Sequence, residues 1–234
     1  MIVHVYALTW NEHDLLPLFF KNYSYASKFY FLDYNSNPID QVMMKQDPRA
    51  EIVSLPIKEL DDDYIANLKN TVWKQSREAD WVVVQDFDEF AYHPDMLALL
   101  ERLKNEGCTV IQCEGWDVVR REIPTSMEGL RGVRYPHNDK MLIFNPKAIN
   151  NMNYVIGAHG AKPEGTVKIN THTVKLMHMK MACGLDYFLW RRASSAKKLS
   201  TNNRVHKWGC ECLRPLKVQI TEFEDAEKKA VGIS

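Results

Sequence analysis

The chain has 234 residues, 45% of them hydrophobic, which is enough to bury the core of one sizeable domain. Lys plus Arg and Asp plus Glu number 30 each, so the net charge is zero and does not point to a nucleic-acid partner. The five cysteines form no Cys-x-x-Cys pair, and their odd number favours reduced structural thiols over a disulfide framework. No apolar stretch approaches the roughly 20 residues that cross a bilayer.

The two ends of the sequence differ in character. The first residues, Met-Ile-Val-His-Val-Tyr, lack the basic and then apolar pattern of a signal peptide, so we expect a cytoplasmic protein. The C-terminal third is locally basic, with charges at Arg191, Arg192, Lys197, Lys198, Arg204 and Lys207. Such a run fits a solvated helix face, or contact with phosphate or a membrane surface. Peripheral membrane association therefore stays open.

Predicted strands and helices alternate in the first half of the chain. Apolar β-branched runs indicate strands, and apolar residues at a spacing near 3.6 indicate helices. In chain order we expect a strand at 2–9, a helix at 14–26, a strand at 29–32, a turn at 33–38, a strand at 51–55, a helix from 61–63 to about 79, a strand at 81–85, a helix at 94–105 and a strand at 109–112. Strands at 140–144 and 169–180 and a helix at 186–196 follow. This order predicts an α/β fold with a mainly parallel sheet and helices on both faces.

Three of the predicted strands end in polar segments. In sheets of this kind, ligands bind beyond the carboxyl ends of the strands. The segments are Thr9-Trp10-Asn11-Glu12, Asp33-Tyr34-Asn35-Ser36 and Asp86-Phe87-Asp88-Glu89, and each carries a carboxylate. A sheet that only packs has no need of such residues, so we expect the functional site here.

Asp86 and Asp88 follow a buried apolar strand. Residues two apart in an extended chain point the same way, so the two carboxylates should repel each other unless a cation compensates. Mg²⁺ or Mn²⁺, bridging carboxylates and substrate phosphates, suits such a pair. The same spacing at Asp61 and Asp63 is better explained as the capped start of a helix. A structural turn is the alternative for the first pair.

The other two strand ends offer nucleotide contacts. Thr9, Asn11 and Glu12 can hydrogen-bond a base or ribose, although Asn11 can equally cap the following helix. Asp33 can accept hydrogen bonds from a ribose or base, or form an Asx-turn.

Two histidines and a lysine are further candidates. Alternation over 171–180 puts His178 and Lys180 on one face of a strand, where a neutral imidazole can ligate a metal and Lys180 can neutralise phosphate. A hydrogen-bonded core histidine is the alternative. His159, in Gly157-Ala158-His159-Gly160, either contacts substrate or forms a turn.

Glu114, Asp117 and Asp139 are candidates for a general base that deprotonates an acceptor hydroxyl, which requires a group within hydrogen-bond reach. Surface ion pairs are the alternative for each, and the sequence does not rank them.

Taken together, the strand-end motifs, above all Asp86-Phe87-Asp88-Glu89-Phe90, resemble the GT-A glycosyltransferases, and are most similar to small bacterial family 2-like proteins. The segments Lys140-Met141-Leu142-Ile143-Phe144, Gly157-Ala158-His159 and His178-Met179-Lys180 resemble the same group in order and spacing. The resemblance covers roughly residues 1–195.

The resemblance implies a Rossmann-like GT-A fold and transfer of a sugar from a UDP- or GDP-sugar to a glycan or lipid-linked acceptor, as in cell-surface polysaccharide or lipopolysaccharide synthesis. It implies a divalent metal on Asp88, with Asp86 and His178 as further ligands. Donor contacts are expected from Thr9, Asn11, Glu12, Asp33, Asp86, Lys140, His159 and Lys180.

We expect residues 1–115 to form the nucleotide-sugar-binding half of one domain, 116–196 its acceptor side, and 197–234 an extension. Two other functions stay open. A nucleotidyltransferase or phosphotransferase would favour a Gly-rich loop after the first strand, where this chain has Thr-Trp-Asn-Glu. A non-catalytic protein that binds nucleotide sugars would bind without turnover.

Overall fold

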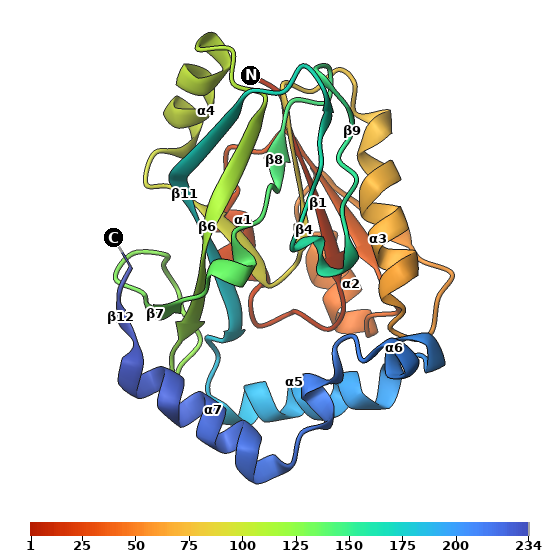
Figure 1. The fold of residues 1–234 in the computed structure, drawn as a ribbon, viewed down its shortest axis with the longest axis vertical. Helices are drawn as coiled ribbons and strands as arrows, with labels where there is room; N and C mark the ends of the chain where they lie inside the picture. Colours follow the sequence, from red (N-terminus) through yellow and green to blue (C-terminus); the bar gives the residue numbers. More distant parts are fainter. Residues whose placement is uncertain (234) are drawn as a thin grey trace.

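The structure, a computed structural model, describes residues 1–233 and is built around one large sheet (Figure 1). The sheet has 10 strands, in the order β12-β7-β6-β8-β4-β1-β2-β3, with β11 beside β6 and β5. Its strands are β1 (Val3–Thr9), β2 (Lys28–Asp33), β3 (Ala50–Ser54), β4 (Trp81–Asp86), β5 (Glu89–Tyr92), β6 (Val110–Val119), β7 (Arg131–Arg134), β8 (Ile143–Phe144), β11 (Ile169–Met181) and β12 (Val231–Gly232). A separate pair joins β9 (Ile149–Asn151) and β10 (Glu164–Gly165).

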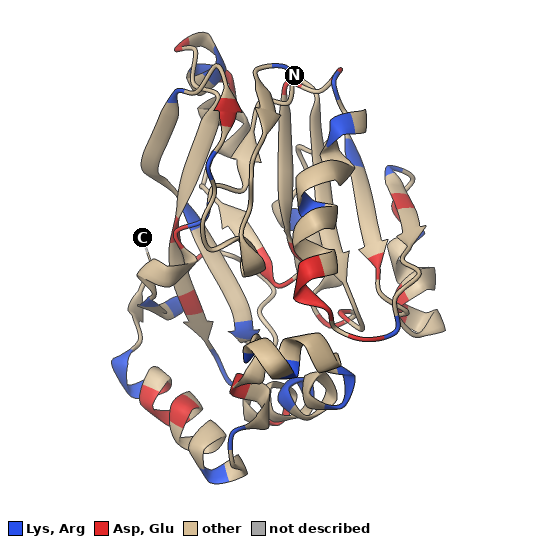
Figure 2. Ribbon diagram, turned by 45° about the vertical axis from the view of Figure 1, so that its right-hand side comes forward, with Lys and Arg blue, Asp and Glu red and all other residues tan. Residues whose placement is uncertain are grey.

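The half of the sheet that runs from β4 through β1 and β2 to β3 is parallel. β1 lies between β2 and β4 and runs parallel to both, with Thr9 opposite Asp33 and Leu8 opposite Asp86. β2 and β3, and also β6 and β11, are parallel pairs, whereas β5, β7, β8 and β12 add antiparallel neighbours. The predicted mainly parallel α/β sheet is therefore confirmed. The ends of β1, β2 and β4 lie side by side at the carboxyl ends of the parallel strands, and Figure 2 shows acidic residues there and at the start of α3.

Helices cover both faces of the sheet, as predicted. The helices are α1 (Leu16–Asn22), α2 (Pro38–Met44), α3 (Asp62–Thr71), α4 (Met96–Asn105), α5 (Leu185–Lys198), α6 (Thr201–His206) and α7 (Leu216–Lys229), with short 3₁₀ turns η1 (Val72–Gln75), η2 (Pro136–Asn138), η3 (Ile156–Ala158) and η4 (Cys210–Leu213). One apolar core holds α1 and α4 against Val3, Val5 and Ala7 of β1. A second core packs Trp73 and neighbouring residues against Tyr6 on the opposite face.

Several expected boundaries move. The predicted helix over 14–26 is only Leu16–Asn22, and the helix expected to reach 79 ends at Thr71, where the chain tightens into η1. The predicted turn at 33–38 leads straight into α2, which the sequence reasoning missed although Asn37 caps it. The strand expected at 140–144 is only Ile143–Phe144, and the four-residue β5 was not expected at all.

The C-terminal helices lie across the carboxyl ends of the parallel strands, at the lower end of Figure 1. A parallel bridge joins Leu60 to Leu199, so this segment is fastened to the loop before α3. Beyond α7, β12 pairs with β7, so the C-terminal extension expected over 197–234 adds the last strand at this edge of the sheet. Within the described residues, no helix is long and apolar enough to cross a membrane.

We expect Phe19→Ala to destabilise the fold strongly. Phe19 is fully buried and contacts the rings of Phe29, Phe31 and Phe87, so truncation leaves a cavity in the core. The free energy of unfolding, measured by urea titration, should fall by about 3–5 kcal/mol. Ile39→Ala, at a position 65% exposed, serves as the control and should change it by less than about 0.5 kcal/mol. A loss equal to that of the control would show that this core is not tightly packed.

Candidate active site

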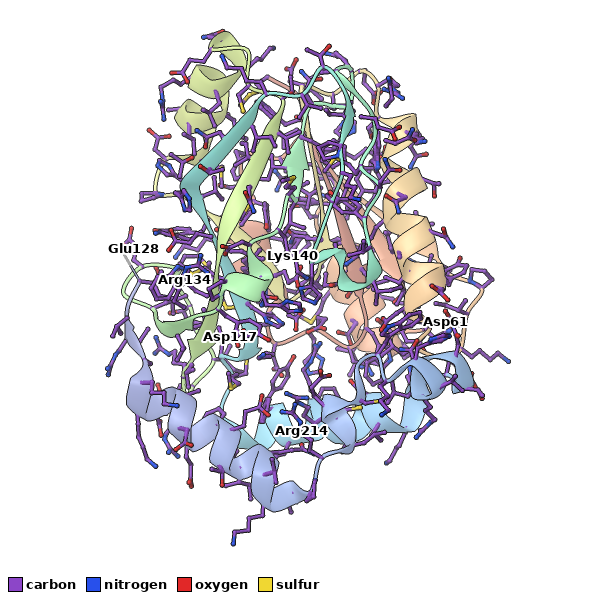
Figure 3. All side chains as sticks on the ribbon, viewed as in Figure 1. Asp61, Asp117, Glu128, Arg134, Lys140 and Arg214 are labelled. Carbon is purple, nitrogen blue, oxygen red and sulfur yellow. The ribbon has the colours of Figure 1, made fainter. Side chains whose placement is uncertain are left out.

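A cavity of about 340 Å³ lies where the parallel strands end and α5 crosses them. Its walls come from the ends of β1 and β4, one face of α3 and one face of α5. Lys140, at the centre of Figure 3, reaches it from the loop before β8. The predicted site residues that line it are Thr9, Glu12, Asp86, Asp88, Lys140, His159 and His178.

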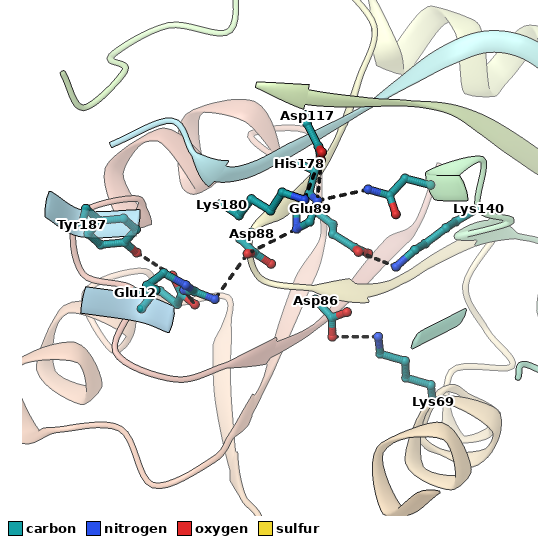
Figure 4. A network of polar contacts seen from close by, with 12 residues as sticks. Glu12, Lys69, Asp86, Asp88, Glu89, Asp117, Lys140, His178, Lys180 and Tyr187 are labelled. Atoms are coloured by element: carbon teal, nitrogen blue, oxygen red, sulfur yellow. Dashed lines mark hydrogen bonds and ion pairs between the residues drawn. The ribbon is translucent and has the colours of Figure 1, made fainter. Parts of the chain in front are cut away.

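Two cationic groups compensate the carboxylate of Asp88. Its Oδ2 lies 3.3 Å from Nη2 of Arg191 and 3.6 Å from Nε2 of His178 (Figure 4). Burial alone would raise the pKa of Asp88, but the charges of Arg191 and His178 outweigh burial and hold it below the usual range. Asp88 is therefore ionised, and two cationic groups face it from β11 and α5.

Asp117, on β6, holds the other side of the His178 ring. Its Oδ1 lies 2.9 Å from Nδ1 of His178, and because an ionised carboxylate only accepts hydrogen bonds, Nδ1 carries the hydrogen. Burial lowers the pKa of His178, but hydrogen bonds with Asp117 and Asp88 raise it overall, to about 9. Lys180 contacts the same carboxylate, with Nζ 3.0 Å from Asp117 Oδ2. Asp117 therefore fixes the ring so that Nε2 faces Asp88.

Two buried lysines neutralise the other two carboxylates of the Asp86–Glu89 segment. Lys69 of α3 is 2% exposed and places Nζ 2.7 Å from Asp86 Oδ1, and Lys140 pairs with Glu89. Lys69 and Lys140 hold the pKa of Asp86 below its usual value despite burial. Sequence reasoning missed Lys69, and it named Glu89 only as part of a strand-end motif. The available signal for Lys69 was its place four residues after Ile65 on the inward face of α3.

Arg191 ties α5 to the end of β1. Its guanidinium bonds Glu12, whose Oε2 also accepts a hydrogen bond from Tyr187 at 3.1 Å. Burial raises the pKa of Glu12 to about 7 even though Arg191 opposes the shift. Arg191 appeared in the sequence only as part of a basic run. Arg191 lies four residues after Tyr187, which places both side chains on one face of α5. This spacing was the sequence pattern that could have predicted an inward-facing Arg191.

Aromatic rings form another wall of the cavity. Trp10 and Tyr34 line it, with their ring centroids 6.4 Å apart. Nζ of Lys198 lies 3.8 Å from the centroid of the Trp10 ring and 4.6 Å from that of Tyr34. Burial lowers the pKa of Lys198, and its ammonium group contacts these two rings at the cavity wall.

Other predicted contacts lie outside the cavity. Asn11 accepts a hydrogen bond from the backbone of Asn37, and Asp33, 1% exposed, accepts one from the backbone of Ser36, as the Asx-turn alternative proposed. Lys180 lines a smaller adjoining hollow.

His159, in contrast, does face the cavity, and burial together with the charge of Lys140 lowers the pKa of its imidazole to about 4.

None of the three general-base candidates lines the cavity. Asp139 lies 2.7 Å from Arg134, and Glu114 lies 3.4 Å from the same guanidinium and 3.2 Å from Lys175. Asp117 reaches the cavity only through His178. The ion-pair alternative therefore describes Glu114 and Asp139.

Asp88 and His178 fit a divalent cation. An imidazole oriented by a carboxylate is the usual form of a histidine ligand, and 3.6 Å between Nε2 of His178 and Asp88 is a separation that two ligands of one ion can span. Because the metal-free ring is protonated at neutral pH, a bound ion would replace the proton on Nε2. Asp86 faces Lys69 instead. Among residues 1–233, no three His, Cys, Asp or Glu side chains form a ready metal cluster, so substrate oxygens would have to complete such a site.

We expect Asp117→Asn to lower the pKa of His178 in the metal-free protein. The wild-type ring should titrate near pH 9, and loss of the Asp117 carboxylate should move it toward the ordinary 6.5, as measured by NMR of the imidazole nitrogens. Because the folded-state pKa is raised, the stability it contributes is complete below about pH 6.5 and is lost as pH rises through 9. His159, whose pKa is about 4, is the internal control and should not move. An unchanged His178 titration would contradict the orienting role of Asp117.

No protein-family model matches this chain, and no curated protein matches it in sequence. Solved structures do match in fold. The crystal structure of residues 1–349 of S. aureus TarS, a glycosyltransferase, superposes with a TM-score of 0.50 at 10% identity, covering 91% of this chain and 71% of that one. The same region in complex with UDP-GlcNAc gives 0.48 at 11% identity, covering 91% and 72%, and TarS itself gives 0.48 at 11%, covering 91% and 43%. The first of these likenesses shows that the chain has the mixed α/β fold of that glycosyltransferase.

Proposed function

We propose that this chain is a metal-dependent glycosyltransferase that uses a nucleoside-diphosphate sugar. The observation that carries the proposal is the pairing of Asp88 with His178 and Arg191 in a cavity at the carboxyl ends of parallel strands. The fold shared with TarS supports the same reaction class. UDP- and GDP-sugars are the donors we propose, with a glycan or lipid-linked acceptor of the kind used in polysaccharide or lipopolysaccharide synthesis.

The cavity offers separate surfaces for the parts of such a donor. The Trp10 and Tyr34 rings give a base an aromatic wall, and the ammonium group of Lys198 beside them can neutralise a phosphate. Arg191 and Lys140 face the centre of the cavity, where a diphosphate would add negative charge. Both cations already sit beside carboxylates, so the incoming phosphates would share them rather than find them free.

Asp88 and His178 are the residues we propose as metal ligands. A bound Mg²⁺ or Mn²⁺ would stabilise the charge that develops on the leaving diphosphate. The protein's own part is to keep Asp88 ionised and to aim Nε2 of His178 at it, through Asp117. Asp86 stays with Lys69 and holds that end of α3 against the strand.

Asp62 is the group we propose as general base. Of the carboxylates that line the cavity, Glu12, Asp86, Asp88 and Glu89 each lie within 4.0 Å of a Lys or Arg, whereas among the described residues Asp62 has no such partner. Burial, and then the charge of Asp86, raise the pKa of Asp62 to about 6. A base with a pKa close to the working pH is the efficient kind for taking a hydroxyl proton.

We expect Asp88→Asn to abolish Mn²⁺-dependent transfer. The amide removes the charge that a metal would require, so turnover of UDP- or GDP-sugars should fall by at least about a hundredfold. Turnover is measured as the amount of nucleoside diphosphate released. Asp63→Asn is a matched control, because Asp61 and Asp63 repeat the spacing at an exposed helix start.

Calorimetric titration of UDP and GDP with and without Mn²⁺ separates the remaining alternatives. Binding that needs Mn²⁺ together with turnover supports the proposal. Binding without turnover of any donor would favour the non-catalytic alternative, and unchanged turnover in Asp88→Asn would exclude the proposed role of Asp88.

We expect Asp62→Asn to lower kcat by roughly 10²–10⁴-fold while leaving nucleoside diphosphate affinity within a few-fold. In the wild type, turnover should rise with pH through about 6, because only the ionised carboxylate accepts a proton. The variant should lose this limb of the pH profile, and Asp63→Asn should keep it. A retained limb near pH 6 in Asp62→Asn would assign the base to another group.

A further inference from the structure

A surface with both basic and apolar side chains forms the end of the molecule that carries α6 and the start of α7 (Figure 1). We name it the α6–α7 surface, and its defining residues are Arg204, Val205, Lys207, Leu213, Leu216 and Lys217. Val205 is 71% exposed, Leu216 61% and Leu213 46%, which is unusual for three large apolar side chains on one short stretch. The core does not use these residues.

The charge of this stretch is as distinctive as its apolar exposure. Residues 197–217 carry six Lys or Arg against one Glu, a net charge of +5 in a chain whose total is zero. Lys207 and Lys217 are exposed, and neither has an acidic partner within 4.0 Å among the described residues. Basic side chains that flank exposed apolar ones suit a surface that is negatively charged outside and apolar beneath.

We propose that the α6–α7 surface docks on an anionic lipid bilayer. The apolar side chains of Val205, Leu213 and Leu216 enter the boundary between headgroups and acyl chains. Lys207 and Lys217 contact lipid phosphates. The adjoining part of α7 sets the limit of this contact, because it bears Glu222, Glu224, Asp225 and Glu227 and shows as red in Figure 2. Three of these four carboxylates already pair with Arg or Lys, namely Glu222, Asp225 and Glu227, so this stretch has no excess of positive charge to offer an anionic lipid. The first turn of α7 is therefore the part that lies at the membrane.

The docked orientation brings the cavity close to the bilayer. Gly209, between α6 and η4, lines the cavity, as do Ser195 and Lys198 of α5. The segment that touches lipid is therefore continuous with one wall of the candidate active site. An acceptor held in the membrane would reach the cavity without leaving the bilayer. Docking itself does not depend on the proposed function, and only this consequence for the acceptor rests on it.

Vesicle flotation of the full chain, without nucleotide or metal, tests the proposal. The protein should float with vesicles of phosphatidylcholine containing phosphatidylglycerol, stay behind with pure phosphatidylcholine, and be released by high salt. The double variant Lys207→Glu/Lys217→Glu should bind at least roughly thirtyfold more weakly, from the attraction expected per basic residue. The control Lys45→Glu/Lys162→Glu makes the same charge change at exposed lysines elsewhere and should float like wild type.

The contribution of the exposed apolar side chains to membrane binding is tested with a second pair of variants. Val205→Ser/Leu216→Ser should also lose binding, whereas Val155→Ser/Val231→Ser, at two positions each 55% exposed, should not. Circular dichroism melting of each variant distinguishes lost docking from lost folding. The proposal would be overturned if the wild-type protein did not float with anionic vesicles, or if the α6–α7 variants floated as well as their controls. Calorimetric nucleotide binding, measured without vesicles, reports on the proposed function independently.

Discussion

Compensation of negative charge at one edge of the sheet is the constraint on which the rest of the structure depends. Glu12, Asp86, Asp88 and Glu89 all lie there, and three of the four are less than a tenth exposed. Buried carboxylates that are neither paired nor protonated are strongly unfavourable. The cations come from elsewhere: Lys69 from α3, Lys140 from the loop before β8, His178 from β11 and Arg191 from α5.

This arrangement is a poor way to gain stability. A buried ion pair recovers little more than the cost of desolvating its two charges, and packed apolar side chains would serve the fold as well or better. The aromatic core around Phe19 shows that the chain packs apolar side chains efficiently elsewhere against the same sheet. Charges concentrated in a cavity instead suit a ligand that is itself charged. Pairs such as Lys140 with Glu89 would hold the cations in place for a ligand of this kind.

Local sequence patterns predicted the parts of the fold that depend on local physics. The apolar runs of β1, β2 and β4 are long and bounded by polar residues, so the strands, their parallel order and the meeting of Thr9, Asp33 and Asp86 at one edge followed from periodicity. Short elements were missed because their stability comes from tertiary contacts. β5 has four residues and exists through its pairing with β11, and α2 depends on a cap within a segment that resembles a turn.

The sequence predicted the carboxylates of the site but not the lysine and arginine that pair with them. His178 beside Asp88 was expected from a resemblance and agrees with the geometry, while its function stays a prediction. Lys69 and Arg191 were not expected, because a lysine or arginine in a helix is ordinarily solvated and only the fold shows which ones turn inward. The general-base candidates were proposed from residue type alone, because the sequence does not show which side chains they contact in the fold. Glu114 and Asp139 meet Arg134, and no pattern in the chain links these three residues.

The contact between Glu12 and Arg191 has a consequence for how the protein is made. The two residues are 179 positions apart, so the site joins the start of the chain to a helix that leaves the ribosome much later. Until then, the ends of β1 and β4 present carboxylates without Arg191 or His178 to neutralise them. Closing so long a loop is slow compared with pairing neighbouring strands. Water must therefore solvate this edge during synthesis, and the cavity takes shape only when α5 docks.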